Sequence, residues 1–437
     1  MHAITSKAIL LVTLVILIFS VAACSRSDGL SSDGRKQVRV FLLLLNTKQV
    51  EFFETAADDF EAANPGTDIV IEQFPGSSLK DYEIKIRLRY ASNQAPDIWS
   101  YRENELAQFV NLDLLSPAPD YIKDIVDNNS VNDLVRTAPY FNGELYGMTW
   151  AAGWQALYYN KAMFAEVGLD PEKPPVNWAE LLEYADKLTI RDANGNIQRA
   201  GLSLRKTGFK PGTGEKWLTF FYSAGGVPFN EDGTKILIDS PAGRATFDFY
   251  DEIFTRRIDG IEVEGDQRGF GQGRVAMFIR ELHIVDWLNT NYPDIEYGVA
   301  AIPPRDSTTI GYSSGGAYPM VVSKTAAHPE IAWRFLEFIG SHERYEEYIR
   351  ITQDLPVMKS VADLPEFRNN PFTSVFLNQP VYPPPKFAHD RYSLEKLGEY
   401  IERFCYGYLT GDEAAARAAE EINGLLEVAY ERSGGTD

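Results

Sequence analysis

Three short apolar runs, separated by two amphipathic stretches, fill residues 38–101 and constrain the fold more than any other feature of the sequence. The runs VRVFLLLL (38–45), TDIVIEQF (67–74) and APDIWSY (95–101) have the length and apolar character of buried strands. Apolar residues recur at helical spacing after the first run, and a second helical stretch follows the second run. This β-α-β-α-β order predicts an α/β fold in which helices flank a parallel sheet.

The carboxyl ends of such strands are where ligands bind in open parallel sheets. In this chain the three ends are residues 45–47, 74–76 and 99–101. We therefore expect ligand-binding side chains to follow the first and third strands closely.

Two further amphipathic helices are predicted at residues 177–189 and 330–340. Asn177 directly precedes an apolar stripe and has the side chain of an N-cap. Trp178 and Trp333 lie on the apolar stripes, so we expect both rings to pack in the core.

The first 23 residues have the features of a secretory signal peptide. Lys7 precedes the apolar run AILLVTLVILIFSVAA (8–23), which is short for a bilayer span of about 20 residues. The residues VAAC resemble a bacterial lipobox, in which Cys24 becomes an N-terminus that carries acyl chains such as palmitate. Residues 24–37 are rich in Ser, Asp and Gly and predict a flexible tether. An uncleaved signal anchor with an incidental cysteine is the alternative.

Charge and cysteine content narrow the classes of function. The chain has 437 residues and a formal net charge of −20, which argues against nucleic acid and against electrostatic binding to anionic lipid. With Cys24 lipidated, Cys405 has no disulfide partner, and the five histidines lack the spacing of a metal site. We therefore expect no cofactor and no metal.

Patterns that suggest catalysis fail in their sequence context. GYSSG (311–315) matches the G-x-S-x-G pattern of a nucleophile elbow, which needs a helix directly after the serine. A β-type run, GAYPMVV (316–322), follows instead, so we expect no catalysis by Ser313. GFGQGR (269–274) lacks the spacing of a dinucleotide-binding G-x-G-x-x-G. A surface glycoside hydrolase that uses two of the many carboxylates is the enzyme alternative.

Several blocks of sequence occur in the order of a known family. The most recognisable block, GWQALYYNKAMFAEVGLDPEKPPVNWAELLEYADKLT, covers residues 153–189; GFGQGRVAMFIRELHIVDW (269–287), SSGGAYPMVVSK (313–324) and GDEAAARAAEEINGLL (411–426) follow. In order and spacing these blocks resemble the extracellular solute-binding proteins of ABC importers, in the sugar-binding group that includes the maltodextrin-binding proteins. The resemblance extends over most of the chain.

This resemblance implies an α/β, two-lobed periplasmic-binding-protein-like fold, each lobe a sheet flanked by helices, with a ligand cleft between the lobes. The N-terminal lobe would comprise residues 38–150 plus 302–341, and the C-terminal lobe residues 151–301 plus 342–437. A hinge motion would close the cleft on its ligand.

The resemblance also implies the partners and the location of the protein. The partners are a small-molecule carbohydrate and the transmembrane subunits of an ABC permease. The protein would be an exported monomer, held at the outer face of the cell membrane (or in the periplasm) by its N-terminal lipid alone. A binder of a non-sugar solute is a second alternative.

A sugar site needs aromatic faces for the C–H surfaces of the ring and polar side chains for the hydroxyls. The 23 Tyr, 25 Phe and 7 Trp supply aromatic faces in excess. The positions that match the family's contact regions are expected to bind ligand: Asn46, Lys48, Tyr101, Glu103, Asn104, Trp150, Trp154, Glu215, Trp217, Arg280, Glu281, His283, Gly315, Gly316 and Tyr318.

One position departs from the pattern of the maltodextrin-binding proteins. Gly153 stands where that pattern has a carboxylate. The departure argues against maltose itself as the ligand.

Overall fold

The computed structural model describes most of the chain, and the expected signal peptide and Cys24 lie outside the described residues. The described ranges are residues 29–43, 46–75, 79–382 and 390–432.

These residues form two compact units that exchange the chain three times. The first unit holds the residues up to Trp99 together with Val322–Phe335, and the second holds Ser100–Val321 and the residues from Leu336 onward. The lobes expected from the sequence have other bounds. Compactness is set by packing, whereas a lobe is defined by how it moves, so the lobe bounds stay a prediction.

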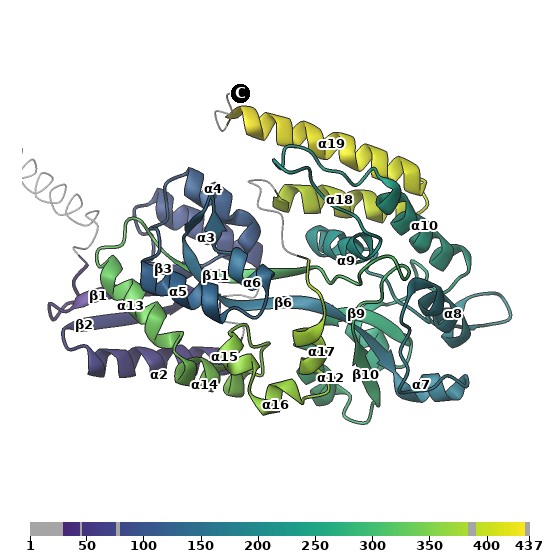
Figure 1. Cartoon of the computed structure of the whole chain (residues 1–437), viewed down its shortest axis with the longest axis horizontal. Coiled ribbons are helices and arrows are strands. Elements are labelled where there is room, and N and C mark those ends of the chain that lie inside the picture. The colour runs from purple at the N-terminus through teal and green to yellow at the C-terminus, as the bar shows by residue number, and fades with distance from the viewer. Residues whose placement is uncertain (1–28, 44–45, 76–78, 383–389, 433–437) are drawn as a thin grey trace, which may run out of the picture. The chain divides into compact units, whose positions relative to one another are not determined.

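The first unit is built on a parallel sheet. Strand β1 (Lys36–Leu42) pairs in parallel with β2 (Thr67–Gln73) and with β3 (Ile98–Ser100). Helix α2 (Thr47–Ala63) connects β1 to β2 and runs beside them in Figure 1, and α3 (Leu79–Ala91) leads to β3. The β-α-β-α-β order predicted for this region is confirmed.

The second half of the expected tether belongs to the fold of the first unit. The Gln37 N–H donates to the Gly29 carbonyl at 2.7 Å. The Arg35 guanidinium donates to the carboxylates of Glu61 and Asp68, each at 2.6 Å. These bonds connect residues 29–37 to α2 and β2, which explains why a Ser- and Gly-rich sequence is ordered here.

The second unit is organised by one long strand, β6 (Gly147–Asn160). Its first part pairs antiparallel with β11 (Gly315–Val322), from Gly147 opposite Val321 to Trp154 opposite Gly315. Its second part lies between β9 (Met277–Glu281) and β10 (Tyr297–Ala300), both antiparallel to it. One strand therefore brings three distant segments of the chain together.

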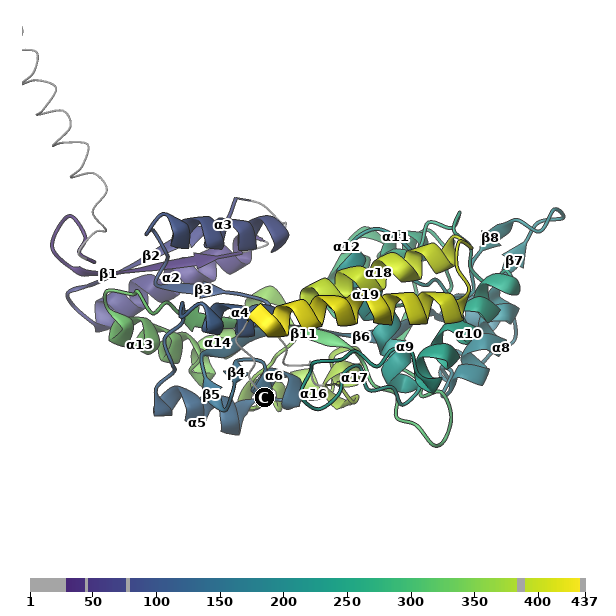
Figure 2. The ribbon, with the colours of Figure 1, turned by 90° about the horizontal axis from the view of Figure 1, so that it is seen from above.

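Helices cover this sheet and enclose the main core of the unit. Figure 2 shows α18 and α19 side by side, and α18 also packs on α9. The other elements are η1 (Glu103–Glu105), α4 (Leu106–Asn111), α5 (Asp120–Asn129), α6 (Asp133–Thr137), β4 (Tyr140–Phe141), β5 (Glu144–Leu145), α7 (Lys161–Glu166), α8 (Trp178–Leu188), β7 (Ile190–Arg191), β8 (Ile197–Arg199), α9 (Lys210–Ser223), α10 (Pro241–Thr255), α11 (Asp266–Gly271), α12 (Ile284–Asn291), α13 (Pro329–Ile339), α14 (His342–Thr352), α15 (Lys359–Ala362), α16 (Pro365–Arg368), α17 (Thr373–Asn378), α18 (Asp390–Cys405) and α19 (Gly411–Arg432).

Helix α8 begins as the sequence predicts. The Asn177 side chain accepts a hydrogen bond from the Glu180 N–H at 2.9 Å, as an N-cap does. Trp178 is buried, with its ring centroid 4.5 Å from that of Phe249 and 5.9 Å from that of Phe220. The prediction that Trp178 and Trp333 are core residues is confirmed, since both are buried.

Among the described helices, none combines the length and the apolar content that a bilayer crossing requires.

Two glycines allow α9 and α18 to approach closely. A Cβ atom on Gly398 would lie 2.1 Å from the Lys210 carbonyl oxygen, and one on Gly214 would lie 2.8 Å from the Leu394 carbonyl oxygen. Gly424 of α19 differs, because a Cβ there would meet nothing within 4 Å. The close contact of α9 with α18 thus depends on the absence of side chains at Gly214 and Gly398.

We predict opposite effects for the same substitution in the two helices. Gly398→Ala should lower the free energy of unfolding by about 1–3 kcal/mol, because backbone atoms would have to separate. Gly424→Ala should raise it by roughly 0.5–1 kcal/mol, because alanine has a higher helix propensity than glycine at an exposed helical position. Urea unfolding followed by circular dichroism measures both, and equal effects at the two sites would contradict this account of the packing.

Candidate functional site

Strand pairing brings a glycine-lined stretch of backbone beside an arginine. Gly316 of β11 lies opposite Gly153 of β6 in the register of the two strands. A Cβ on Gly316 would lie 2.8 Å from Nη2 of Arg102, so the guanidinium lies directly over this glycine. Any larger residue at position 316 would displace Arg102.

Arg102 is part of a partly buried ion-pair network. Its guanidinium is paired with the carboxylate of Glu215 on α9, and its Nε lies 3.9 Å from Oε1 of Glu103. The side chain of Glu103 is 5% exposed and accepts a hydrogen bond from the Ala317 N–H at 2.7 Å. Burial raises the pKa of Glu103, against the opposing effects of Arg102 and this N–H group.

A second group of charges lies at the end of β9. Glu281 is opposite Gln155 of β6, and its carboxylate is paired with the Lys216 ammonium and with Nε of Arg280, the latter at 3.0 Å. Arg280 also pairs with Asp266 and donates to Oε1 of Gln267 at 2.6 Å. These contacts join β9, α9 and the start of α11.

The two partners of the Lys216–Glu281 pair respond differently to burial. The Lys216 side chain is 4% exposed, and burial lowers its pKa to about 8 although Glu281 opposes the change. Burial alone would raise the pKa of Glu281, but Lys216 and Arg280 outweigh it and hold that pKa far below its usual range. The carboxylate has two cations and the lysine has one carboxylate, which accounts for the asymmetry.

We call this set the charged cluster: Arg102, Glu103, Glu215, Lys216, Arg280 and Glu281. It places cations and carboxylates next to one another, beside the glycine backbone of Gly315 and Gly316 in β11. Such an array donates and accepts hydrogen bonds at neighbouring points, as a ligand with several hydroxyl groups requires. Gly153 leaves space beside the array, since a Cβ there would be 3.7 Å from the nearest side-chain atom, Cγ of Glu281.

The structure places six of the expected residues in the charged cluster or in the glycine backbone beside it: Glu103, Glu215, Arg280, Glu281, Gly315 and Gly316. Tyr318 follows on β11 and is half-buried, and the charges of Arg102 and Glu103 act on its hydroxyl, whose pKa is raised mainly by burial. His283 is exposed at the N-terminus of α12, two residues after Glu281.

The expected tryptophan platforms are buried in this structure. Trp217 is 0% exposed, with its ring 5.2 Å from that of Phe221 and nearly parallel to it. Trp154 is 1% exposed and donates from Nε1 to the Phe376 carbonyl at 2.8 Å. Trp150 is 4% exposed, and its ring lies 5.1 Å from that of Tyr345. None of the three rings offers a free face here, and a binding role for any of them stays a prediction.

The four remaining expected residues are not members of the charged cluster, although Tyr101 and Asn104 flank Arg102 and Glu103 in the chain. Tyr101 is buried with its ring edge toward Phe109, and Asn104 is buried with no hydrogen-bond partner for Oδ1 among the described residues. Asn46 is the N-cap of α2, accepting from the Gln49 N–H at 3.0 Å, and Lys48 is exposed in the first turn of α2.

Two members of the charged cluster, Arg102 and Lys216, are outside the expected set. Each is a direct sequence neighbour of an expected carboxylate, Arg102 of Glu103 and Lys216 of Glu215. A cation next to a candidate carboxylate in the sequence could therefore have identified both residues. The sequence could not show which carboxylate each cation pairs with, because Arg102 pairs with one that is 113 residues away.

The serine of the GYSSG motif is held in place by hydrogen bonds to the backbone of β6. Ser313 is buried, accepts from the Gln155 N–H at 2.7 Å and donates to the Gln155 carbonyl at 2.8 Å. Strand β11 follows it directly, so the expectation that no helix follows this serine is confirmed. Within the described ranges, no group of His, Cys, Asp and Glu side chains is arranged to hold a metal ion.

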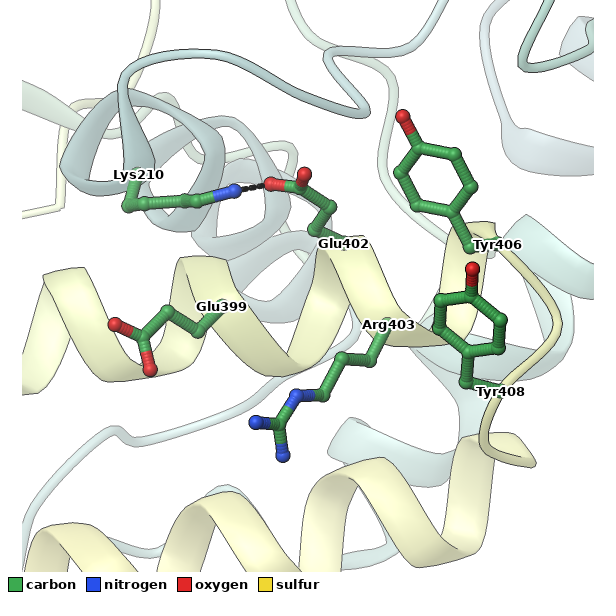
Figure 3. Close-up of a pocket in the computed structure, with 6 residues that line it drawn as sticks. All are labelled: Lys210, Glu399, Glu402, Arg403, Tyr406 and Tyr408. Carbon is green, nitrogen blue, oxygen red and sulfur yellow. Dashed lines mark ion pairs between the residues drawn. The ribbon is translucent and has the colours of Figure 1, made fainter.

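A separate hollow of about 280 Å³ lies at the C-terminal end of α18 (Figure 3). Its lining consists of Lys210, Glu399, Glu402, Arg403, Tyr406 and Tyr408. Lys210 and Glu402 are paired with each other, and the Tyr406 and Tyr408 rings are stacked 5.9 Å apart on the surface. No residue expected to bind ligand lines this hollow, so the charged cluster is the stronger candidate.

We predict that Glu281 stabilises the fold in a pH-dependent way. Because its folded-state pKa lies below the ordinary 4.5, its contribution is present above pH 4.5 and is lost as the pH falls. Glu281→Gln should cost roughly 3 kcal/mol at pH 7, near the lower end for breaking a buried pair, and the cost should shrink below pH 4.5.

Unfolding free energies of wild type and variant between pH 7 and pH 3 test this. Glu252→Gln, which changes an exposed carboxylate of α10 paired with Arg256, is the control and should change stability by less than about 0.5 kcal/mol. A Glu281→Gln cost that stays constant down to pH 3 would show that the carboxylate charge is not what stabilises.

Comparison with known proteins agrees with this fold. A model of the bacterial extracellular solute-binding protein family matches residues 55–372. A putative binding protein of Brucella abortus (strain 2308) is 26% identical over 351 residues, covering 79% of this chain and 82% of the relative. The maltotriose-binding protein of Pyrococcus abyssi (strain GE5 / Orsay) is 23% identical over 339 residues, covering 75% of this chain and 68% of the relative.

A solved structure shows the same architecture. The crystal structure of the cyclic alpha-maltosyl-1,6-maltose binding protein from Arthrobacter globiformis matches with a TM-score of 0.76 at 21% identity, covering 90% of this chain and 99% of that chain. The α/β, two-lobed periplasmic-binding-protein-like fold expected from the sequence is thereby confirmed. Because the family model matches well over half of the chain, this protein belongs to the bacterial extracellular solute-binding protein family.

Proposed function

We propose that this protein is the substrate-binding component of an ABC importer, which captures a carbohydrate outside the cytoplasmic membrane and delivers it to the permease. The charged cluster carries the proposal: paired cations and carboxylates beside the glycine backbone of Gly315 and Gly316 suit the hydroxyl groups of a sugar. Membership of a solute-binding family supports it, as does the resemblance to proteins that bind maltotriose and a cyclic maltosyl-maltose.

The charged cluster contains residues from both of the lobes expected from the sequence. Arg102 belongs to the expected N-terminal lobe (38–150), and its partner Glu215 belongs to the expected C-terminal lobe (151–301). We infer that solute binding and closure involve this pair, since a ligand that engages Arg102 and Glu215 would bind both lobes at once. Closure by a hinge is the usual motion of binding proteins of this kind.

The proposal predicts binding without chemistry. A thermal-shift screen of mono- and oligosaccharides should find sugars that raise the unfolding temperature, because a ligand that binds only the folded state stabilises it by RT ln(1 + [L]/Kd). Incubation with the same sugars should leave them intact by chromatography. Solution scattering at saturating sugar should give a smaller radius of gyration.

The possible outcomes separate the candidate functions. Cleavage of an oligosaccharide would favour a glycoside hydrolase instead. Stabilisation only by peptides or polyamines would favour a binder of non-sugar solutes. An unchanged scattering curve with bound sugar would contradict closure while leaving binding in place.

We further propose that the mature protein is a monomer anchored by lipid at Cys24, which would hold it near its permease. The lipobox-like VAAC and the Ser- and Gly-rich residues after it support this proposal. Cys24→Ala should abolish lipid attachment, so that the protein is released or stays unprocessed. Detergent-phase partitioning and mass spectrometry of the N-terminal peptide measure this, and recovery of unmodified wild type cleaved elsewhere would refute the anchor.

A further inference from the structure

Arg205 is a cation of the second unit that forms no ion pair with any carboxylate in the described ranges. Its Nε atom is buried and has no hydrogen-bond partner within the described ranges. Burial, followed by the charge of Arg280, lowers the pKa of this guanidinium. The Arg205 side chain as a whole is half-buried, and a cation with a buried, unbonded N–H group is costly unless an acceptor comes to it.

The Arg205 side chain lies against the first turn of α9. A Cβ on Gly212, the third residue of that helix, would be 3.1 Å from Cζ of Arg205 and 3.4 Å from its Nε. The N-cap residue, Phe209, supplies no side-chain hydrogen bond to the helix. The hydroxyl of Thr213 is fully buried and likewise has no partner in the described part of the chain.

The N-terminus of a helix carries partial positive charge and unbonded N–H groups. At α9 this positive end lies beside the Arg205 guanidinium, and Glu402, the carboxylate near the same turn, is already paired with the ammonium of Lys210. Arg205 Nε, which lies against Gly212, and Oγ1 of the next residue, Thr213, are buried polar atoms without hydrogen-bond partners among the described residues. Together they have the donor chemistry of an anion site.

The neighbouring charges do not compensate Arg205. Arg205 repels the nearby cations Lys216 and Arg280, and the carboxylates that attract it are those of Asp266 and Glu281. Arg280 is paired with both of these carboxylates, and Glu281 is paired with Lys216 as well. Among the described residues, Arg205 is therefore the cation of this group that has no ion pair of its own.

We propose that the solute captured at the charged cluster carries an anionic group, a carboxylate or a phosphate, and that Arg205, the first turn of α9 and the Thr213 hydroxyl receive it. This inference rests on the proposed function and narrows its substrate from carbohydrates in general to sugar acids or sugar phosphates. A neutral hydroxyl can accept a hydrogen bond from Arg205, but it leaves the charge of Arg205 without an anionic partner.

The first arm of the test compares acidic sugars with their neutral parents. Glucuronate, galacturonate, digalacturonate and glucose 6-phosphate are titrated beside glucose, galactose and galactobiose by calorimetry at constant ionic strength. At least one acidic sugar should bind about tenfold or more tightly than its parent, as a charge-assisted hydrogen bond implies. The uronates and the phosphate in the panel distinguish a carboxylate site from a phosphate site.

The second arm uses Arg205→Gln, with Arg244→Gln as a control of equal charge change on an exposed pair of α10. Arg205→Gln should weaken the acidic sugar by about tenfold or more, whereas Arg244→Gln should not change its affinity. Arg205→Lys should retain part of the affinity, because it keeps the charge but loses the planar fork. Without ligand, Arg205→Gln should unfold at the same or a higher temperature than wild type, since an unmatched charge is removed.

The results separate this inference from the function beneath it. Neutral sugars that bind as tightly as their acidic counterparts, with affinities unchanged by Arg205→Gln, would overturn the anionic solute and leave carbohydrate capture in place. A lower unfolding temperature of ligand-free Arg205→Gln, with unchanged affinity for the acidic sugar, would show that Arg205 only supports the fold. Failure of every sugar to bind wild type would overturn the proposed function itself.

Discussion

The antiparallel pairing of β6 with three other strands is the constraint on which the candidate site depends. One strand of 14 residues carries β11 along its first part and both β9 and β10 along its second part. Because register in a sheet is fixed residue by residue, pairing Trp154 with Gly315 and Gln155 with Glu281 determines where the polar ends of β9 and β11 lie. A slip of one residue would turn every side chain to the other face, so the site and the core of the unit are specified by the same hydrogen bonds.

Compensation of charge is the second requirement of the charged cluster. Each ion here loses hydration on burial, and only a partner at hydrogen-bond distance offsets that loss. Glu281 has two such partners, whereas Lys216 has one, and the shifts of their pKa values follow that difference. Arg205 has none in the described part of the chain. A binding site differs from a purely structural network in this respect, because some of its charges and hydrogen-bonding groups stay without partners until the ligand binds.

The sequence predicts what depends on local pattern and leaves open what depends on distant pairing. The alternation of apolar runs was sufficient for β1, β2 and β3, and the N-cap of α8 follows from Asn177 and the stripe behind it. Composition was a weaker guide for the aromatic residues. Trp217 belongs to a helix whose residues are buried on nearly all sides, and no period in the sequence distinguishes a buried ring from a platform there. The pairing of Arg102 with Glu215 is also invisible to local pattern, because a long stretch of chain separates the two residues.

Glycine has the same role at each critical contact of the second unit, which is to let a charged or backbone group come closer than a side chain would permit. Gly316 admits the Arg102 guanidinium, Gly212 admits that of Arg205, and Gly398 admits the backbone of α9. The first two contacts bring cations against backbone that a side chain would otherwise cover, and the third sets how α18 packs on the helix that carries Glu215 and Lys216. Close approach through glycine has a cost in stability, because glycine loses more conformational entropy on folding than other residues do. This loss of stability falls on the strands and helices that position the charged cluster and Arg205. Binding sites commonly give up stability in this way, because they hold polar groups in place for a ligand.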